Sequence, residues 1–237
     1  AFEAVREGKQ RWMVAGGAEE ISPSYAAVFD TLYAASTLNE APAKTPKPFD
    51  ANRDGLVTGE GAGSLILETL ESAQARGAKI YAEIVGFGTN SDGSHITQPN
   101  QDTMQIAMEM ALADAQLKPQ NIGYINAHGT ATDRGDIAES HATFNVFGDS
   151  VPISSLKSYM GHTLGACGAL EAIFSINMMN DGWFCPTVNL SEIDPKCAPL
   201  DYIRNDVRAV NTNYIMSNNF AFGGINTSLI FKRYEDA

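Results

Sequence analysis

Apolar residues follow two different spacings along the chain, and stretches of the two kinds alternate. Short apolar runs, as in buried strands, lie at residues 12–15, 64–68, 79–86 and 122–126. Apolar positions three or four residues apart predict helices at residues 70–76, 103–115, 136–147 and 165–180. The ends read as a helix closed by Gly8 and as two strands, from residue 214, joined by a turn at 222–224. Because such alternation is typical of sheets buried between helices, we predict an α/β layered fold.

The composition is that of an ordinary globular protein with an acidic charge balance. The 237 residues are 44% apolar, enough to fill one large or two modest domain cores. Lys and Arg number 16 against 28 Asp and Glu, and the net charge of -12 argues against sequence-independent binding to nucleic acid or an anionic membrane. No apolar run approaches the roughly 20 residues of a membrane span, and no leader is visible. We expect a soluble, cytoplasmic protein without nucleic-acid or membrane partners.

Three cysteines, Cys167, Cys185 and Cys197, raise the question of a thiol nucleophile. An odd number in a chain of this length favours reduced thiols, and no spacing among them resembles a zinc site. Cys167 follows His162 by five residues, but in a helix starting at Gly161 it would lie about 140° away around the axis. Its small neighbours suggest tight packing inside a core. We therefore expect Cys167 to be a packing residue and the other two to be ordinary thiols.

Three stretches carry polar groups that a core would not favour. NAHGTATDRGDIAE, residues 126–139, places His128 in a glycine-rich loop directly after a predicted strand, where catalytic side chains are often held. SLKSYMGHTLGACGALE, residues 155–171, holds Lys157 and His162 just before a helix. NNFAFGGIN, residues 218–226, has two glycines that allow close approach to a ligand. Each alone has a structural interpretation: a buried imidazole, a solvated lysine and a tight turn.

Together with VAGGAEE, FDANRDGLVTGEGAGSLILE and AKIYAEIVGFGTNSD, these three stretches follow one another along almost the whole chain. In this order and spacing the six resemble the β-ketoacyl synthases of the elongating, two-histidine type (KAS I/II), within the thiolase-like family. The resemblance implies a thiolase-like layered αβαβα fold. This chain would hold the end of the first half, residues 1–78, and the whole second half, residues 79–237.

The resemblance implies a decarboxylative Claisen condensation in fatty acid or polyketide-type chain elongation. An acyl thioester would react with malonyl-acyl carrier protein, without a cofactor. The implied partners are an acyl carrier protein bearing phosphopantetheine, acyl and malonyl thioesters, and a second synthase subunit, identical or related. The family's nucleophilic cysteine is expected upstream of residue 1, so this chain alone should be inactive. One alternative is a non-catalytic, chain-length-factor-like partner subunit, and another is a cysteine hydrolase using Cys167.

Residue by residue, the resemblance implies a catalytic group of five. His128 and His162 would donate N–H to the enolate formed on decarboxylation, as an oxyanion hole does. Lys157 would keep both imidazoles neutral, since a nearby cation disfavours their protonation. Glu139 matches the family's glutamate paired with that lysine. The backbone N–H of Phe222 matches one half of the oxyanion hole for the acyl thioester, and its ring the gate of the acyl pocket.

Further residues are implied for binding. Thr130 and Thr132 match the threonines that hydrogen-bond the pantetheine arm. Two mobile loops would form the entrance, one with Phe220, Gly223 and Gly224, the other with Asp92, His95 and Thr97. Asn126, Glu171 and Ser217 match a monovalent cation site of some members. His141 reads as a surface or packing residue. Because acyl carrier proteins are acidic, cations should gather at the entrance, and the candidates are Arg53, Arg134, Lys157 and Lys44.

Overall fold

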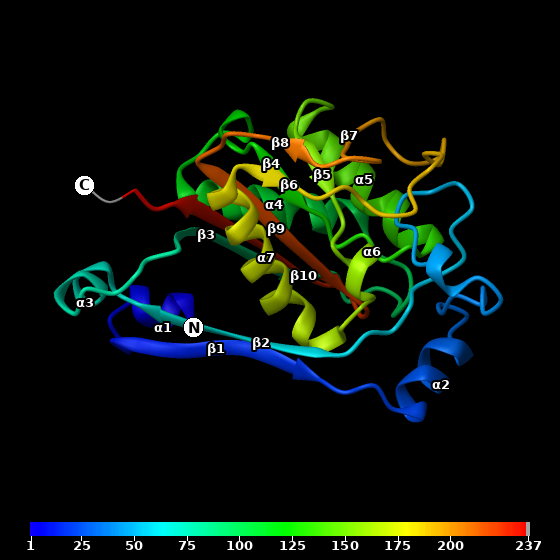
Figure 1. Ribbon diagram of the computed structural model, residues 1–237, viewed down its shortest axis with the longest axis horizontal. Helices are drawn as coiled ribbons and strands as arrows, with labels where there is room; N and C mark the ends of the chain where they lie inside the picture. Colours follow the sequence, from blue (N-terminus) through cyan, green and yellow to red (C-terminus); the bar gives the residue numbers. More distant parts are fainter. Residues whose placement is uncertain (236–237) are drawn as a thin grey trace.

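The centre of the molecule is a mixed six-stranded sheet, seen in Figure 1 in the computed structural model, which describes residues 1–235. Its strands, in spatial order, are β3 (Ala82–Ser91), β10 (Ile225–Arg233), β9 (Tyr214–Ala221), β4 (Tyr124–Asn126), β5 (Pro152–Ser154) and β7 (Asp201–Tyr202). β3, β10 and β9 pair antiparallel, whereas β9, β4, β5 and β7 run parallel. The carboxyl ends of β9, β4 and β5 therefore meet at one edge of the sheet, where loops can gather functional side chains.

One face of the sheet is covered by α4 (Gln101–Ala115) and α5 (Asp133–Phe147). The side chain of Asn100 caps α4 by accepting hydrogen bonds from the N–H groups of Asp102 and Thr103. Apolar side chains of α4, among them Met104 and Met108, pack with Ile125 of β4 and others in one buried cluster. Removing this surface from water is the main stabilising contribution of the layer.

The opposite face is covered by α7 (Cys167–Asp181), which lies between the central sheet and a long two-stranded ribbon (Figure 1). The ribbon consists of β1 (Trp12–Glu19) and β2 (Gly61–Glu68), which pair antiparallel along their whole length. A Cβ atom on Gly17 would lie 1.9 Å from the carbonyl oxygen of Gly165, so only glycine lets the ribbon approach the start of this helix. The arrangement gives ribbon, helix, sheet and helix layers.

Shorter elements complete the fold. The helices are α1 (Phe2–Arg6), α2 (Pro23–Thr31), α3 (Leu70–Ala75) and α6 (Lys157–Met160), and β6 (Trp183–Phe184) pairs antiparallel with β8 (Arg208–Ala209). Single 3₁₀ turns lie at Pro42–Lys44, Pro119–Asn121 and Leu164–Ala166. Over the described residues, no helix combines the length and apolar character that a membrane crossing requires.

The predicted α/β layered class is confirmed, but several predicted bounds are wrong. β3 continues five residues beyond the predicted end at Gly86, because this glycine and Gly88 lie inside the strand where α4 passes close above them. A Cβ atom on Gly88 would lie 2.1 Å from the carbonyl oxygen of Ala107. The helix predicted from residue 165 begins at Cys167, after a 3₁₀ turn. The pattern also missed α2, a helix none of whose residues is buried.

Candidate active site

A cavity of about 880 Å³ lies at the edge of the sheet where β4, β5 and β9 end. Segments far apart in the sequence line it, including the loop after β4, the turn before α7 and the loop after β9. The predicted site residues that line it are His95, Thr97, His128, Thr130, Thr132, Glu139, His162, Phe220, Phe222 and Gly224. The structure therefore brings most of the predicted site together in one place.

His128 follows β4 by two residues, and only 8% of it is exposed. Its Nδ1 lies 3.2 Å from the Nζ of Lys157. An ammonium group can only donate, so Nδ1 accepts and the proton of the neutral imidazole is on Nε2. Burial holds the pKa of His128 well below its ordinary value, and the charge of Lys157 adds to the effect. The ring is thus a neutral N–H donor at physiological pH.

His162 lies in the turn before α7 and is fixed by a second segment. Its N–H donates to the carbonyl oxygen of Val57 at 2.7 Å, and its own carbonyl accepts from the N–H of Gly59 at 2.9 Å. The N–H of Leu164 donates to its Nδ1 at 3.1 Å, which again leaves the proton on Nε2. Burial and the Lys157 charge lower the pKa of His162 to about 3. The two imidazole centroids are 5.2 Å apart, with the rings nearly perpendicular.

Lys157, whose Nζ contacts the ring of His128, is only 1% exposed. Its Nζ is 2.5 Å from Oε1 of Glu171. Burial is the largest single influence and acts to lower the pKa of Lys157, but Glu171 and the other nearby acidic groups together outweigh it, and the pKa lies above its ordinary value. The lysine therefore stays charged, as a source of positive potential behind His128 should. Its side chain is buried too deeply to belong to a carrier-binding surface.

The predicted pairing of Glu139 with Lys157 is wrong, because the carboxylate in contact with the lysine is that of Glu171 on α7. Glu139, on α5, accepts the backbone N–H of His128 on Oε1 and that of Gly129 on Oε2, both at 2.7 Å. Burial raises the pKa of Glu139, and these N–H groups oppose that rise. Glu139 thus fixes the backbone that carries His128.

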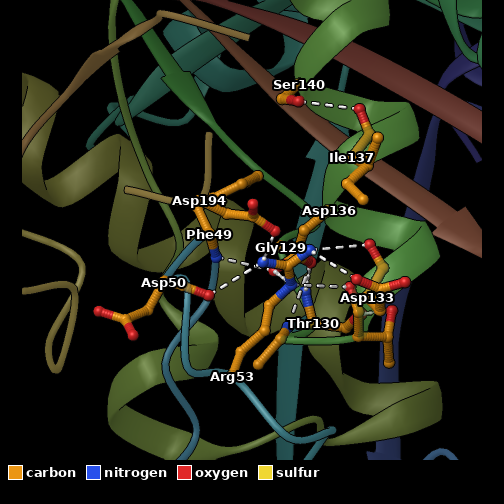
Figure 2. Close-up of polar contacts among 12 residues, drawn as sticks. Phe49, Asp50, Arg53, Gly129, Thr130, Asp133, Asp136, Ile137, Ser140 and Asp194 are labelled. Carbon is orange, nitrogen blue, oxygen red and sulfur yellow. Dashed lines mark hydrogen bonds and ion pairs between the residues drawn. The ribbon is translucent and has the colours of Figure 1, made fainter. Parts of the chain in front are cut away.

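Thr130 and Thr132 lie in a segment, residues 129–133, that we call the threonine loop and whose last residue begins α5. Their hydroxyl oxygens are 2.9 Å apart, and both residues line the cavity. Between them Ala131 has a φ of 65°, a left-handed conformation that is unfavourable for alanine. Oδ1 of Asp136 accepts the N–H groups of Thr130 and Ala131 at 3.0 and 3.2 Å, which stabilises this conformation. Figure 2 shows Asp136 among the polar groups that surround the loop.

Sequence reasoning missed Asp136, and it considered the partner Arg53 only as a cation for the entrance. The position of Asp136 was a usable signal, since an acidic residue in the first turn of a helix often binds nearby N–H groups. Arg53 carried no such signal, because its partners lie about 80 and 141 residues away along the chain.

The two predicted entrance loops contact each other directly. The N–H of Asp92 donates to the carbonyl oxygen of Gly224, and the N–H of Gly223 donates to that of Ile96, both at 3.0 Å. The ring of Phe222 lies 5.9 Å from that of Phe29 on α2, measured between centroids. Nδ1 of the exposed His95 accepts from the N–H of Thr97 at 3.2 Å. The loops are adjacent, while their mobility stays a prediction.

The three residues predicted to hold a monovalent cation also lie together and are buried. Nδ2 of Asn126 donates to Oγ of Ser217 at 3.2 Å, and within residues 1–235 Oδ1 of Asn126 has no hydrogen-bond partner. Both carboxylate oxygens of Glu171 already accept hydrogen bonds, one from Lys157 and one from Asn219. The free amide oxygen suits a hard cation, but the carboxylate is already neutralised by an ammonium group.

The predicted direction of Cys167, away from the histidines, is wrong, because the helix begins at Cys167 itself and not at Gly161. The thiol lines the same cavity as His128 and His162 and donates to Oδ1 of Asn219 at 3.1 Å. Burial raises its pKa to about 11, and burial likewise raises that of Cys197 to about 11. Neither thiol is activated as a nucleophile.

Of the four cations considered for the entrance, two are buried in ion pairs. Lys157 contacts Glu171, and the side chain of Arg53 is 2% exposed and contacts Asp194. Arg134 is exposed and lines the cavity, whereas Lys44 is exposed on a 3₁₀ turn outside its lining.

Two family profiles match the chain in succession. Residues 1–73 match "Beta-ketoacyl synthase, N-terminal domain" and residues 81–191 match "Beta-ketoacyl synthase, C-terminal domain". A curated relative, 3-oxoacyl-[acyl-carrier-protein] synthase 1 of Haemophilus influenzae, is 44% identical over 236 residues, which are 99% of this chain and 57% of the relative.

Solved structures agree with this assignment. A β-ketoacyl synthase from Burkholderia phymatum is 65% identical, with a TM-score of 0.98 over 99% of this chain and 58% of that one. A type II polyketide ketosynthase, solved in complex with its acyl carrier protein, is 35% identical, with a TM-score of 0.92 over 98% of this chain and 59% of that one. The chain thus spans under three fifths of these relatives. The matched profiles, the relatives and the paired histidines together place this chain in the β-ketoacyl synthase family.

Proposed function

We propose that the protein containing this chain catalyses decarboxylative condensation of an acyl thioester with a malonyl thioester on acyl carrier protein. In this reaction the bond between the malonyl carboxylate and its α-carbon breaks and carbon dioxide leaves. The electron pair remains as a thioester enolate, whose carbon then attacks the acyl carbonyl and expels the thiolate. The chain's relatives in fatty acid and polyketide synthesis support this class of reaction.

The observation that carries the proposal is the pair of neutral imidazoles with both Nδ1 atoms occupied. Each ring carries its proton on Nε2, and both rings line the cavity. Two preorganised donors suit an enolate oxygen, because they stabilise charge that exists only after decarboxylation begins. The buried cation of Lys157 favours the same developing charge.

The acyl-bearing thiol would come from outside these 237 residues. Cys167 and Cys197 both have raised pKa values, and Cys185 is half-buried with a pKa that burial also raises. A monovalent cation would be held by Oδ1 of Asn126, next to Ser217 and Glu171, and would supply positive charge there. It carries no step of the reaction.

An acyl carrier protein is the proposed macromolecular partner, with the phosphopantetheine arm passing between the entrance loops to Thr130 and Thr132. The related ketosynthase in complex with its carrier protein supports this assignment. A second synthase subunit and a cytoplasmic location remain predictions. A chain-length-factor-like role is less well supported, because a non-catalytic subunit has little need of both histidines, Lys157 and the FGG turn.

The test is carbon dioxide release from malonyl-acyl carrier protein by the natural protein that contains this chain. His162→Ala removes one donor, and we expect a loss of about 10² to 10³ in rate. His141→Ala is the matched control, because His141 lies outside the cavity lining and its Nε2 contacts the carbonyl oxygen of Lys196. Retention of the full rate by His162→Ala would refute the two-histidine mechanism.

A further inference from the structure

The buried guanidinium of Arg53 lies next to the threonine loop and donates hydrogen bonds to the loop and to two further segments (Figure 2). Arg53 belongs to the segment that precedes β2, far from the loop in sequence. Its Nη1 donates to Oδ2 of Asp194 at 2.6 Å and to the carbonyl oxygen of Asp50 at 2.9 Å. With 2% of the side chain exposed, the guanidinium has no freedom to follow a surface ligand.

The remaining donors of Arg53 reach the threonine loop itself. Nε donates to the carbonyl oxygen of Thr132 at 3.2 Å, and Nη2 donates to that of Asp133 at 2.9 Å. Nε also lies 3.5 Å from Oδ2 of Asp136. One rigid, planar group therefore fixes two successive peptide carbonyls and the carboxylate that binds the other end of the loop.

The loop needs this support because its conformation is strained. Ala131 is left-handed, and the N–H groups of Thr130 and Ala131 are both turned inward to one oxygen of Asp136. Burial raises the pKa of Asp136 to about 6, and the charge of Arg53 opposes this rise. Without the guanidinium, the carboxylate would lose its counter-charge and the loop would lose two carbonyl contacts.

We infer that Arg53 is a positioning residue that orients Thr130 and Thr132 toward the amide groups of a pantetheine thioester. The inference rests on the proposed function, which makes such a thioester the substrate. Arg53 contacts the loop through the carbonyl oxygens of Thr132 and Asp133. Its effect passes through the backbone of the threonine loop and is therefore confined to recognition of the arm.

The test compares Arg53→Lys with the unchanged natural protein. Lysine keeps the charge but loses the planar set of donors that reaches Thr132 and Asp133. The probes are the malonyl thioesters of pantetheine, which has amides, and of ethanethiol, which has none. We expect the KM for the pantetheine thioester to rise about tenfold or more, with kcat nearly unchanged. Turnover of the ethanethiol thioester should not change.

Two further variants make the result specific. Arg208→Lys alters a half-exposed arginine that pairs with Asp201 outside the cavity lining, and it should leave both thioesters unaffected. Asp194→Asn weakens the ion pair that holds Arg53 without changing the threonine loop. It should also raise the KM for the pantetheine thioester, by a smaller factor than Arg53→Lys does. This second variant decides the matter if Arg53→Lys does not fold.

An unchanged pantetheine KM in folded Arg53→Lys overturns the inference, and so does an equal change for both thioesters. Pantetheine binding, followed by NMR titration, separates the inference from the proposed function. A protein that binds pantetheine but releases no carbon dioxide refutes the condensation, while the dissociation constant of Arg53→Lys still tests Arg53. Absence of pantetheine binding in the unchanged protein overturns the inference.

Discussion

Lys157 has Glu171 on one side of its ammonium group and His128 on the other. A buried cation is costly unless it is paired, and here one carboxylate supplies the pairing. The charge is thereby kept close to two imidazoles, whose protonation it disfavours. The tautomers and the charge state of the site thus depend on one ammonium group and one backbone N–H.

Replacing Lys157 by Met should raise the pKa of His162 from about 3 toward its ordinary value of 6.5, because one of the two causes of its lowering is removed. As the pH falls, the imidazole of the variant should therefore take up its proton at a higher pH. NMR titration of the ring protons measures this directly. Lys232→Met, which removes an exposed pair with Glu83, is the control. Identical titrations of His162 in all three proteins would contradict the account.

Local sequence could predict the two histidines but not their partners. His128 and His162 stand next to glycines in loops that follow or precede clear elements. Glu139 and Glu171 are both glutamates on predicted helices, so their spacing cannot say which one reaches Lys157. Packing decides, because Glu171 on α7 reaches Lys157 at the start of α6, while Glu139 on α5 reaches the backbone of His128.

At the scale of elements, the loop after β3 and the turn between β9 and β10 form one paired structure. Gly224 makes the pairing possible, since a Cβ atom there would lie 2.2 Å from Oδ1 of Asp92. Gly223 has a similar left-handed backbone, but a Cβ atom there would meet nothing within 4 Å. The two neighbouring glycines thus have similar backbone conformations, but only Gly224 lacks room for a Cβ atom.

Gly223→Ala should lower the free energy of unfolding by about 1 kcal/mol, the cost of a left-handed alanine. Gly224→Ala should cost clearly more, because Asp92 must also move. Urea unfolding monitored by fluorescence gives both values. Equal losses would mean that the contact between the two loops contributes nothing to stability.

The bounds of elements were the least predictable feature at this scale. Gly86 suggested a strand end, yet it lies inside β3 because a helix passes above it. The predicted start of α7 was also wrong, and so was the predicted direction of the Cys167 side chain. Both errors arise because a glycine that permits close packing and a glycine that ends an element look alike in sequence.

At the scale of the whole molecule, the outer face of the β1–β2 ribbon is apolar and exposed. Trp12, Val14 and Ile66 are 59, 62 and 68% exposed, and Val14 is directly opposite Ile66 in the register. A contiguous apolar surface of this kind favours association in water.

The 237-residue chain produced by itself should therefore self-associate. The double variant Val14→Lys with Ile66→Glu should reduce association, since it places an opposite-charge pair across the two strands. Sedimentation velocity measures the change, with Val207→Lys, an exposed valine away from the ribbon, as the control. If the double variant associates as strongly as the unchanged chain, the ribbon face is not responsible.

Sequence patterns predicted the layered class because apolar periodicity reports burial, and burial defines layers. They could not predict the contacts that join distant segments, such as Arg53 with Asp194 or Val57 with His162. The boundary between residues 78 and 79 stays a prediction, and the site contains residues from both sides of it.

The anchoring of His162 by Val57 and Gly59, together with that of the threonine loop by Arg53, has a consequence for recombination between related genes. A crossover near residue 78 would join a segment that supplies these anchors to a segment that was selected with different ones. Chimeras of relatives with this breakpoint should fold their sheets yet misplace the histidine and the threonines. We therefore expect active chimeras only where residues 53–59 come from the same parent protein as residues 129–136 and 162.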